Sequence, residues 1–378
     1  MLEIALLGSI SILAYIYVGY PLLAILLANV VRRPIDRGSE TPEVTMIISA
    51  YNEEKHIAEK IRNVMALEYP RNLLDIVIAS DASDDATDDI VRSHASSQVQ
   101  LLRIEGRRGK TACQNAAAAE ASGEILVFTD ATTMLDPRAL KAIVRNFHDS
   151  RVGCVAGRLV YVSRQDDATG RGGRSYWGYE SILRIAESKL GSLIGVSGQL
   201  YAVRKEVYRP IAPDLISDFV IAMVVREQGL RTVLEPQAVC FEETLDRPDR
   251  ELSMRVRVTL RSLHAIATKR TLLNPLRFGL FAWQLWSHKL MRYLAPLFLL
   301  TALVANIALA AQGQYVVLLL LQLTALAVGA VGFMELRVLR KSRLLTQPYY
   351  FLLTNVASAI SLVRFAKGEK VVTWTPLR

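Results

Sequence analysis

Three cysteines among 378 residues are too few and too widely spaced for a disulfide framework or a metal site. Cys113, Cys154 and Cys240 therefore predict reduced, buried thiols in a cytosolic domain. The sequence also lacks zinc knuckles, helix-turn-helix and RNA-recognition signatures, internal repeats and low-complexity tracts. These absences argue against a nucleic-acid partner, although the net charge is +9. The charge instead favours a protein that lies on an anionic membrane surface and handles anionic substrates.

Residues 4–31 form a long apolar segment in a chain whose mean hydropathy is +0.24. The segment has no basic region before it and exceeds the ~7–15 apolar residues of a secretory signal. It therefore predicts a transmembrane anchor over residues 1–33. Glu3 is the only charged residue before the segment, whereas Arg32 and Arg33 follow it. Because basic residues concentrate on the cytoplasmic side of membranes, the following domain is expected in the cytosol.

A second apolar region predicts a transmembrane hairpin over residues 294–333. Two apolar runs, 294–311 and 315–333, are joined by Gln312-Gly313-Gln314. Each run is long enough to cross a bilayer core of about 30 Å as a helix. Together with the anchor, the hairpin predicts a multi-pass protein of the inner (plasma) membrane.

Two further segments are expected to contact the membrane, either by lying in its interface or by crossing it. Residues 270–293 mix aromatic and basic side chains, which is typical of a helix that lies in the membrane interface. The alternative is the start of a long, tilted span. Residues 347–378 contain an apolar stretch, 349–365, that is interrupted by polar residues. We expect an interfacial or re-entrant segment there, followed by a C-terminal tail, and leave open whether 349–365 crosses.

Residues 40–265 alternate between strand-like and helix-like segments. The predicted strands are 44–49, 76–80, 99–104 and 125–129, and the predicted helices are 53–65, 85–93, 110–121 and 137–147. This alternation predicts an α/β domain with a mostly parallel sheet. The strand 125–129 is apolar and runs directly into Asp130. A carboxylate there lies at the sheet edge where open α/β folds bind ligands, so it is suited to a metal ion or a nucleotide.

An ordered series of motifs resembles the family-2 glycosyltransferases, the group that includes cellulose, chitin and hyaluronan synthases. The motifs are TMIISAYNEE (45–54), DIVIASDASDDAT (75–87), GRRGKTACQNAA (106–117), LVFTDATTMLDP (126–137) and ISDF (216–219). The resemblance is strong over about residues 40–265 and looser over the membrane segments. It implies a GT-A-like nucleotide-sugar-binding domain with N- and C-terminal transmembrane and interfacial helices.

The resemblance implies a set of residues that bind the sugar donor. Tyr51, Glu53 and the preceding Ala50 would hold uridine, and Asp81 would accept a hydrogen bond from the base. Lys110 begins a helix, where free N–H groups and a basic side chain favour an anion. Ordinary helix caps at Asn52 and Asp81, or a solvated basic loop at Lys110, are the structural alternatives.

Two arginines are the predicted partners of the leaving diphosphate. Arg257 and Arg261 are four residues apart and share one helical face, and guanidinium groups bind diphosphates with paired hydrogen bonds. The processive synthases carry Gln-x-x-Arg-Trp in this region, and this sequence lacks both the glutamine and the tryptophan. That departure favours a non-processive enzyme.

The predicted metal ligands are Asp130 and Thr132. The family usually has Asp-x-Asp at this place, but here the second carboxylate is replaced by Thr132. A sugar diphosphate needs a cation, and Mg²⁺ or Mn²⁺ prefers oxygen ligands, so one of these ions is the expected cofactor.

The acceptor side is predicted from two motifs. Gly198 and Gln199 match a family loop that lies under the acceptor sugar, and Trp374 lies in a tail segment that resembles a gating loop. Asp218 is the predicted catalytic base, because inversion at the anomeric carbon needs a carboxylate that removes the acceptor proton. A helix N-cap is the structural alternative for Asp218.

These observations predict an inverting membrane glycosyltransferase that uses a nucleotide sugar, with UDP-sugars favoured. The expected acceptor is a lipid-linked sugar or a growing polysaccharide in cell-surface glycan synthesis. Alternatives are a processive polysaccharide synthase, a polyprenyl-phosphate sugar synthase and a non-catalytic nucleotide-sugar-binding regulator. Membrane lipids are expected partners, whereas homo-oligomers and export machinery stay open.

Overall fold

A computed structural model describes residues 1–31, 33–162, 168–243, 248–333 and 343–373. The chain divides into two compact units. The sheet unit comprises residues 31–162, 184–243 and 371–378, and the helical unit comprises residues 1–30, 163–183 and 244–370. The expected domain 40–265 thus corresponds mainly to the sheet unit.

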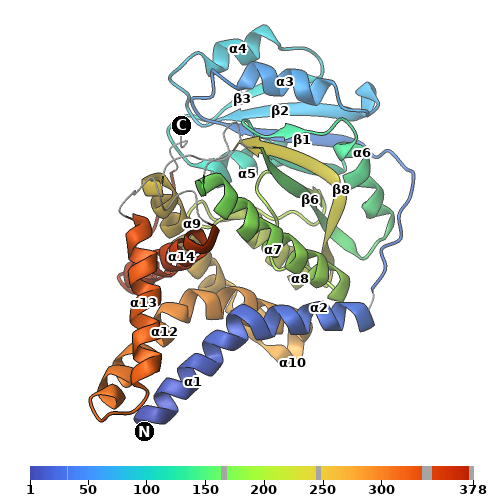
Figure 1. The fold of residues 1–378 in the computed structure, drawn as a ribbon. Helices are drawn as coiled ribbons and strands as arrows, with labels where there is room; N and C mark the ends of the chain where they lie inside the picture. Colours follow the sequence, from blue (N-terminus) through green and yellow to red (C-terminus); the bar gives the residue numbers. More distant parts are fainter. Residues whose placement is uncertain (32, 163–167, 244–247, 334–342, 374–378) are drawn as a thin grey trace. The chain divides into compact units, whose positions relative to one another are not determined.

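The sheet unit contains an eight-stranded mixed sheet with the order β3-β2-β1-β4-β7-β6-β8-β5 (Figure 1). Strands β1 to β4 pair in parallel, β7 runs antiparallel between β4 and β6, and β5 runs antiparallel to β8. The strands are β1 (Val44–Ala50), β2 (Leu74–Ser80), β3 (Val99–Arg103), β4 (Ile125–Asp130), β5 (Met134–Leu135), β6 (Val152–Val162), β7 (Leu200–Arg204) and β8 (Arg231–Glu243).

The four predicted strands are confirmed, with ends that differ by at most two residues. Every residue of β1 is buried, and β2 and β4 are nearly so. Their apolar, β-branched sequences suit parallel strands that are covered on both faces. The three cysteines are free and buried, as expected, and burial raises the pKa of each thiol.

Helices flank this sheet and extend the predicted alternation. They are α3 (Ile57–Met65), α4 (Thr87–Ser93), α5 (Lys110–Glu120), α6 (Ala139–Val144) and α8 (Ser217–Glu227). Short 3-10 turns occupy Arg71–Leu73 and Arg145–His148. Figure 1 shows α3 and α4 on one side of β1–β3 and α5 on the other. The last turns of α7 (Ala168–Leu190) belong to this unit, and its earlier part belongs to the helical unit.

The helical unit consists of helices, several of which are long and apolar. They are α1 (Leu2–Ala14), α2 (Tyr20–Val30), α9 (Pro248–Thr268), α10 (Pro275–Phe278), α11 (Leu280–Gln284), α12 (Met291–Ala310), α13 (Val316–Phe333) and α14 (Arg343–Ala366). A 3-10 turn spans Arg270–Leu273. Leu6 of α1 packs on Ala302, Ala305 and Leu309 of α12. On the other side of the unit, the Ser361 hydroxyl of α14 donates to the Val256 carbonyl of α9 at 3.0 Å.

Two π-helical segments meet inside this unit. Tyr15–Gly19 joins α1 to α2, and Leu285–Leu290 joins α11 to α12. The Tyr15 hydroxyl lies 2.8 Å from the Ser287 hydroxyl and accepts a hydrogen bond from the Trp283 indole at 2.8 Å. A π-helical turn changes the regular pattern of backbone hydrogen bonds in a helix. Here the two turns contact each other through polar side chains, Tyr15 from one and Ser287 from the other.

Among the described residues, three helices are long and apolar enough to cross a membrane: Leu2–Val30, Leu280–Ala310 and Gln347–Ala366. Val316–Val331 is a shorter apolar helix. Leu280–Ala310 is helical throughout, as in the alternative of one long span that begins before residue 294. Gln347–Ala366 is also long enough to cross. Whether residues 349–365 cross the membrane or lie in its interface therefore stays open. The division into anchor, hairpin and interfacial segments stays a prediction.

Candidate functional site

Two strand-to-helix turns lie side by side at the carboxyl edge of the sheet. Asn52, after β1, and Ala82, after β2, both adopt positive φ values, 52° and 54°. The Asn52 side-chain carbonyl accepts a hydrogen bond from the Asp84 backbone at 3.0 Å, and the Glu53 backbone donates to the Thr87 hydroxyl at 2.7 Å. These bonds join the two turns. They stabilise the strained backbone conformations of Asn52 and Ala82.

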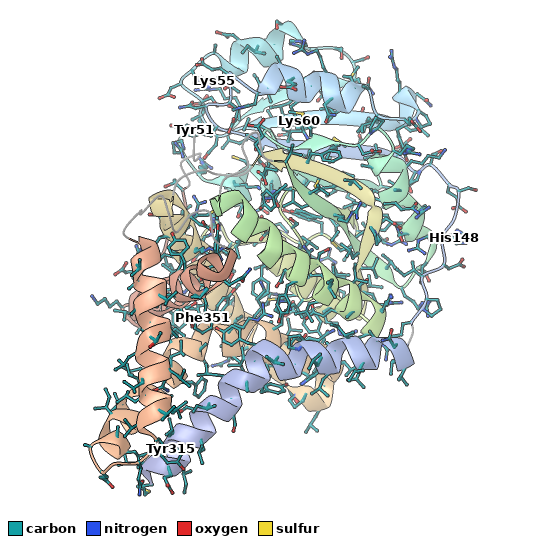
Figure 2. All side chains as sticks on the ribbon, in the orientation of Figure 1. Tyr51, Lys55, Lys60, His148, Tyr315 and Phe351 are labelled. Atoms are coloured by element: carbon teal, nitrogen blue, oxygen red, sulfur yellow. The ribbon has the colours of Figure 1, made fainter. Side chains whose placement is uncertain are left out.

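The same bonds explain why α3 begins four residues later than predicted. Glu53 and Glu54 are bonded to the second turn, and the residue at the N-cap is His56 rather than Asn52. Ala50 and Glu53, two of the predicted donor-binding residues, are buried here. The third, Tyr51, lies at the sheet edge (Figure 2) and carries the Arg107 guanidinium 3.2 Å from its ring centroid.

Asp81 clamps the basic loop of residues 106–109. Its side chain is fully buried, and its carboxylate accepts hydrogen bonds from the Arg108 and Gly109 backbones at 2.8 and 3.0 Å. The Arg107 guanidinium adds a contact at 3.4 Å. Asp81 therefore does not cap α4, whose N-cap residue is Ala86, and its predicted bond to a base stays a prediction.

Lys110 is the first residue of α5, and its ammonium forms an ion pair with the Asp130 carboxylate. Both side chains are about one quarter exposed, 24% and 26%. Gly109 occupies the N-cap position with φ 87°, a conformation that favours glycine. A side chain there would also strike the Val372 carbonyl, 2.5 Å from the position of a Cβ atom. The sheet unit thus places a cationic helix start against the acid at the end of β4.

Asp218 lies in the first turn of α8, inside the helix. The N-cap residue is Ile216, so the simple capping role does not account for Asp218. A Cβ atom at Gly198 would lie 2.9 Å from an Asp218 carboxylate oxygen and 3.4 Å from the Lys110 ammonium. The predicted base and the Lys110–Asp130 pair therefore both lie next to Gly198. Because glycine has no side chain, space remains between these groups.

Glu242 is a site residue that the sequence analysis missed. Near the end of β8, its carboxylate accepts a hydrogen bond from the Gln199 amide at 2.8 Å. Burial and the charge of Asp130 raise the pKa of Glu242 to about 7. The signal was present, because Arg231–Glu243 is a strand that ends in two acids, the same pattern that singled out Asp130.

Gln199 is predicted to bind the acceptor, but its side-chain amide forms hydrogen bonds to other residues of the protein. Its side-chain carbonyl accepts a hydrogen bond from the Ser197 hydroxyl at 2.5 Å, in addition to the bond that it donates to Glu242. The contact with an acceptor stays a prediction for Gln199 and for Gly198.

Lys60 is a second residue that the sequence analysis missed. It lies on α3 facing the sheet (Figure 2), and its side chain is fully buried. Its ammonium donates to the Thr129 hydroxyl at 3.0 Å and to the Thr133 carbonyl. Burial lowers the pKa of Lys60 to about 7, against an opposing effect of the Asp130 charge. Lys60 thus ties together the two ends of the turn that follows β4.

The remaining predicted residues lie elsewhere. Arg257 and Arg261 are on α9, in the helical unit, where Arg261 is buried and burial lowers the pKa of Arg257. Their predicted contact with a diphosphate stays a prediction. Trp374 lies outside the described residues, although Val372, two residues earlier, contacts Gly109 in the sheet unit.

The side chains around Asp130 suit a hard cation. Asp130, Thr132 and Glu242 offer carboxylate and hydroxyl oxygens, which Mg²⁺ and Mn²⁺ prefer. Within the described ranges, no group of three or more His, Cys, Asp or Glu side chains is arranged to hold a metal ion. Mg²⁺ sites commonly combine one or two carboxylates with substrate phosphates and water, so two carboxylates fit a cation that arrives with a nucleotide.

The fold is a GT-A-like α/β fold. Acidic residues follow its strands at the carboxyl edge of the sheet, where α/β proteins bind nucleotides. The family "Glycosyl transferase family 2" matches residues 45–211. A mannosyltransferase from Pyrobaculum calidifontis, solved with GDP-Man and Mn²⁺, superimposes with a TM-score of 0.72 and 26% identity over 98% of this chain and 100% of that one. Residues 45–211 thus resemble glycosyltransferase family 2, in the part of the chain where the motifs predicted the resemblance.

Curated relatives point in the same direction. Poly-beta-1,6-N-acetyl-D-glucosamine synthase of Staphylococcus aureus is 24% identical over 216 residues, which are 56% of this chain and 52% of the relative. The probable glycosyltransferase YdaM of Bacillus subtilis is 28% identical over 126 residues, 32% of this chain and 30% of the relative. The chain thus spans about half the length, or less, of these curated relatives.

Proposed function

We propose that this protein is a membrane-anchored, inverting glycosyltransferase. It would move a sugar from a nucleotide sugar to a lipid-linked sugar or a growing polysaccharide at the cytosolic face of the plasma membrane. The observation that carries the proposal is the meeting of Asp218 and the Lys110–Asp130 pair around Gly198. The family match over residues 45–211, the mannosyltransferase-like fold and the membrane-length helices among the described residues support it.

The sugar donor would lie along the carboxyl edge of the sheet. The base and ribose would contact Tyr51 and the buried turn at Glu53. The Arg107 guanidinium, which lies over the Tyr51 ring, would either move away to admit the base or stack beside it. The diphosphate would lie at the start of α5, where backbone N–H groups and the Lys110 ammonium stabilise negative charge. A bound Mg²⁺ or Mn²⁺ would supply further charge neutralisation on the diphosphate.

Asp218 would act on the acceptor. Its carboxylate takes the proton from an acceptor hydroxyl as that oxygen bonds to the anomeric carbon. The bond from this carbon to the diphosphate breaks on the opposite face, and the nucleoside diphosphate leaves with the electron pair. Lys110 stabilises the charge that develops on the leaving group, which is an electrostatic contribution of the kind that often dominates enzyme rates. The configuration at the anomeric carbon is inverted.

A processive polysaccharide synthase is the second candidate, and one observation favours it. The curated relatives in Staphylococcus aureus carry a polysaccharide synthase name, and they match over 216 residues. The missing Gln-x-x-Arg-Trp pattern favours single transfers instead. Product length therefore separates the two candidates.

The test uses the full-length protein purified in detergent and returned to nanodiscs. Radiolabelled UDP-, GDP- and TDP-sugars are offered with Mn²⁺, Mg²⁺ or EDTA, and with total bacterial lipid extract as acceptor source. Asp218→Asn is compared with Glu227→Gln, which makes the same charge change in the last turn of α8. General base catalysis contributes about 100- to 10,000-fold, so Asp218→Asn is expected to lose that much transfer.

The expected result is transfer of one sugar to lipid by the wild type and Glu227→Gln, with nucleotide binding retained by Asp218→Asn. Proton NMR of the product reports the anomeric configuration, and its chain length separates single transfer from polymerisation. Transfer that is unchanged in Asp218→Asn would overturn the assignment of the base. A product with retained configuration would overturn the inverting mechanism.

A further inference from the structure

One helix of the sheet unit is bonded to both sides of the proposed reaction centre. Lys110, the first residue of α5, forms an ion pair with the acid at the end of β4. The same helix carries Thr111 and Asn115, which are four residues apart and therefore share one helical face. Both side chains form hydrogen bonds to residues 208–215, the segment that leads into α8 and Asp218.

Asn115 binds both backbone polar groups of Ile211. The Asn115 side-chain carbonyl accepts a hydrogen bond from the Ile211 N–H at 3.0 Å, and its amide donates to the Ile211 carbonyl at 2.7 Å. The Tyr208 hydroxyl donates to the same side-chain carbonyl at 2.8 Å. Asparagine is the side chain that this set of bonds requires, because aspartate lacks the donor and alanine lacks both groups.

Thr111 binds the other end of the same segment. Its side chain is buried, and its hydroxyl donates to the Leu215 carbonyl at 3.0 Å. The Leu215 N–H donates to the Ala212 carbonyl at 2.9 Å, so the chain turns here before α8 begins at Ser217. Leu215 is three residues before Asp218, and the bond from Thr111 therefore holds the approach to the first turn of α8.

Two prolines make the anchored segment stiff. Pro210 and Pro213 each restrict one φ angle to about −65°, so the segment has few ways to adjust between its anchors. Beyond the segment, the Val196 N–H donates to the backbone carbonyl of Asp218 at 2.9 Å. Asp218 is thus held on one side by α5, through residues 208–215, and on the other by the loop before β7.

From these contacts we propose that Asn115 and Thr111 are positioning residues for the carboxylate of Asp218. The proposal rests on the proposed function, in which Asp218 takes the acceptor proton while Lys110 stabilises the leaving diphosphate. An Asp218 carboxylate oxygen and the Lys110 ammonium lie 2.9 and 3.4 Å from one point, the position that a Cβ atom at Gly198 would take. One helix sets the place of both groups, because α5 carries Lys110 and also fixes the segment before Asp218.

A loop anchor without a role in catalysis is the alternative. Removing such an anchor would lower the stability of the sheet unit, and its effect on transfer would be the same whether or not the Asp218 carboxylate is present. A positioning residue acts through Asp218, so its removal has little further effect once that carboxylate has been replaced. A double-mutant cycle therefore separates the two roles.

The experiment measures single-turnover transfer from radiolabelled UDP-, GDP- and TDP-sugars to total bacterial lipid extract by the full-length protein in nanodiscs. Asn115→Ala and Thr111→Val are each made in the wild type and in Asp218→Asn, and Thr111→Ser keeps the hydroxyl that Thr111→Val removes. Asn146→Ala is the matched control, because the Asn146 side chain also forms several hydrogen bonds in the sheet unit, to two backbone carbonyls and to Glu235. Apparent Tm values and the Kd for UDP and GDP are measured for every variant.

Asn115→Ala is expected to slow transfer by about 10- to 100-fold, because a displacement of about 1 Å can cost about 100-fold in rate. The Kd for nucleotide should stay at the wild-type value. In Asp218→Asn, the same change should alter the residual transfer by no more than about twofold, the usual error of additivity. Thr111→Val should slow transfer less than Asn115→Ala, and Thr111→Ser should be close to the wild type. Asn146→Ala should lower the apparent Tm and have the same small effect on transfer in both backgrounds.

Equal losses from Asn115→Ala in both backgrounds would overturn the proposal, and so would a wild-type transfer rate in Asn115→Ala. The threonine pair replaces the cycle if Asp218→Asn leaves no measurable transfer, and equal rates in Thr111→Val and Thr111→Ser would then overturn the proposal.

The proposed function fails by a different result, a wild type that transfers no sugar from any donor. Hydrogen–deuterium exchange over residues 208–220 tests the positioning independently of transfer. Asn115→Ala is expected to raise exchange in this segment and in the first turn of α8, whereas Asn146→Ala should leave both unchanged. Exchange in α8 that Asn115→Ala does not alter would overturn the positioning of Asp218, whatever the outcome for transfer.

Discussion

Asp81 and Asp130 end neighbouring parallel strands, β2 and β4, that flank β1 on its two sides. Both acids follow buried apolar runs, yet their surroundings differ. Asp81 is fully buried and accepts two backbone N–H groups of the loop 106–109, whereas Asp130 is 26% exposed and meets the Lys110 ammonium. The same sequence pattern therefore produces a buried clamp in one place and a partly exposed, ion-paired carboxylate in the other.

The difference arises from what lies next to each strand end. The loop after β3 closes over Asp81 with two backbone N–H groups and the Arg107 guanidinium, which together satisfy the buried carboxylate. At Asp130, the neighbour is a side chain, the Lys110 ammonium. Side chains can move to admit a cation and a diphosphate, while a closed backbone loop is costly to open. We therefore expect Asp130 to act in chemistry and Asp81 to act mainly in folding.

The sharpest test of this contrast is Asp130→Asn. We expect sugar transfer to fall by about 100- to 1,000-fold, because a charge that holds the cation and orients Lys110 is lost. The apparent Tm should change little, since a partly exposed ion pair contributes about 0–1 kcal/mol. Initial rates and thermal unfolding of the same preparation report both quantities. A large fall in Tm with normal transfer would reverse the roles that we assign to the two acids.

The reciprocal variant, Asp81→Asn, is expected to act first on stability. An amide in place of the carboxylate leaves a buried backbone N–H of the loop poorly satisfied, which costs about 1–3 kcal/mol. Limited proteolysis should then cut at residues 106–109 sooner than in the wild type. Unchanged Tm and proteolysis, combined with a selective loss of UDP affinity, would instead support the direct contact with the base that the family resemblance implies.

A smaller effect is expected from the buried ammonium beneath the Asp130 turn. The pKa of Lys60 is lowered to about 7, whereas an unfolded lysine titrates near 10.5. Between these values the unfolded chain binds a proton that the folded chain lacks, so stability should rise with pH from about 7 to about 10. The slope from this group is at most about 1.4 kcal/mol per pH unit.

Lys60→Met should abolish that slope. Thermal unfolding at pH 7, 8 and 9 would show the wild type gaining stability over Lys60→Met as pH rises. Lys141→Met, a change of the same type at an exposed lysine on α6, is the control and should follow the wild type. A constant difference between wild type and Lys60→Met across this range would mean that Lys60 keeps its proton when the protein folds.

Much of the sheet unit could be predicted from local patterns. Buried β-branched runs marked β1 to β4 within two residues, and an acid after β4 marked the site edge. The helix starts were less predictable. α3 begins at Ile57 because Glu53 and Glu54 bond to a turn some thirty residues later, which no local propensity encodes. The capping roles considered for Asn52 and Asp81 were displaced by the same long-range contacts.

The sequence by itself determined the alternating α/β pattern, the apolar helices and the acids that follow strands. These features depend on side-chain periodicity and on residues close together in the chain. Tertiary structure alone decided that Asp81 closes a loop, that Asp130 faces Lys110, and that Gln199 donates to Glu242. Each of these roles depends on the tertiary fold, in which strand pairing joins residues up to 107 positions apart (134 and 241).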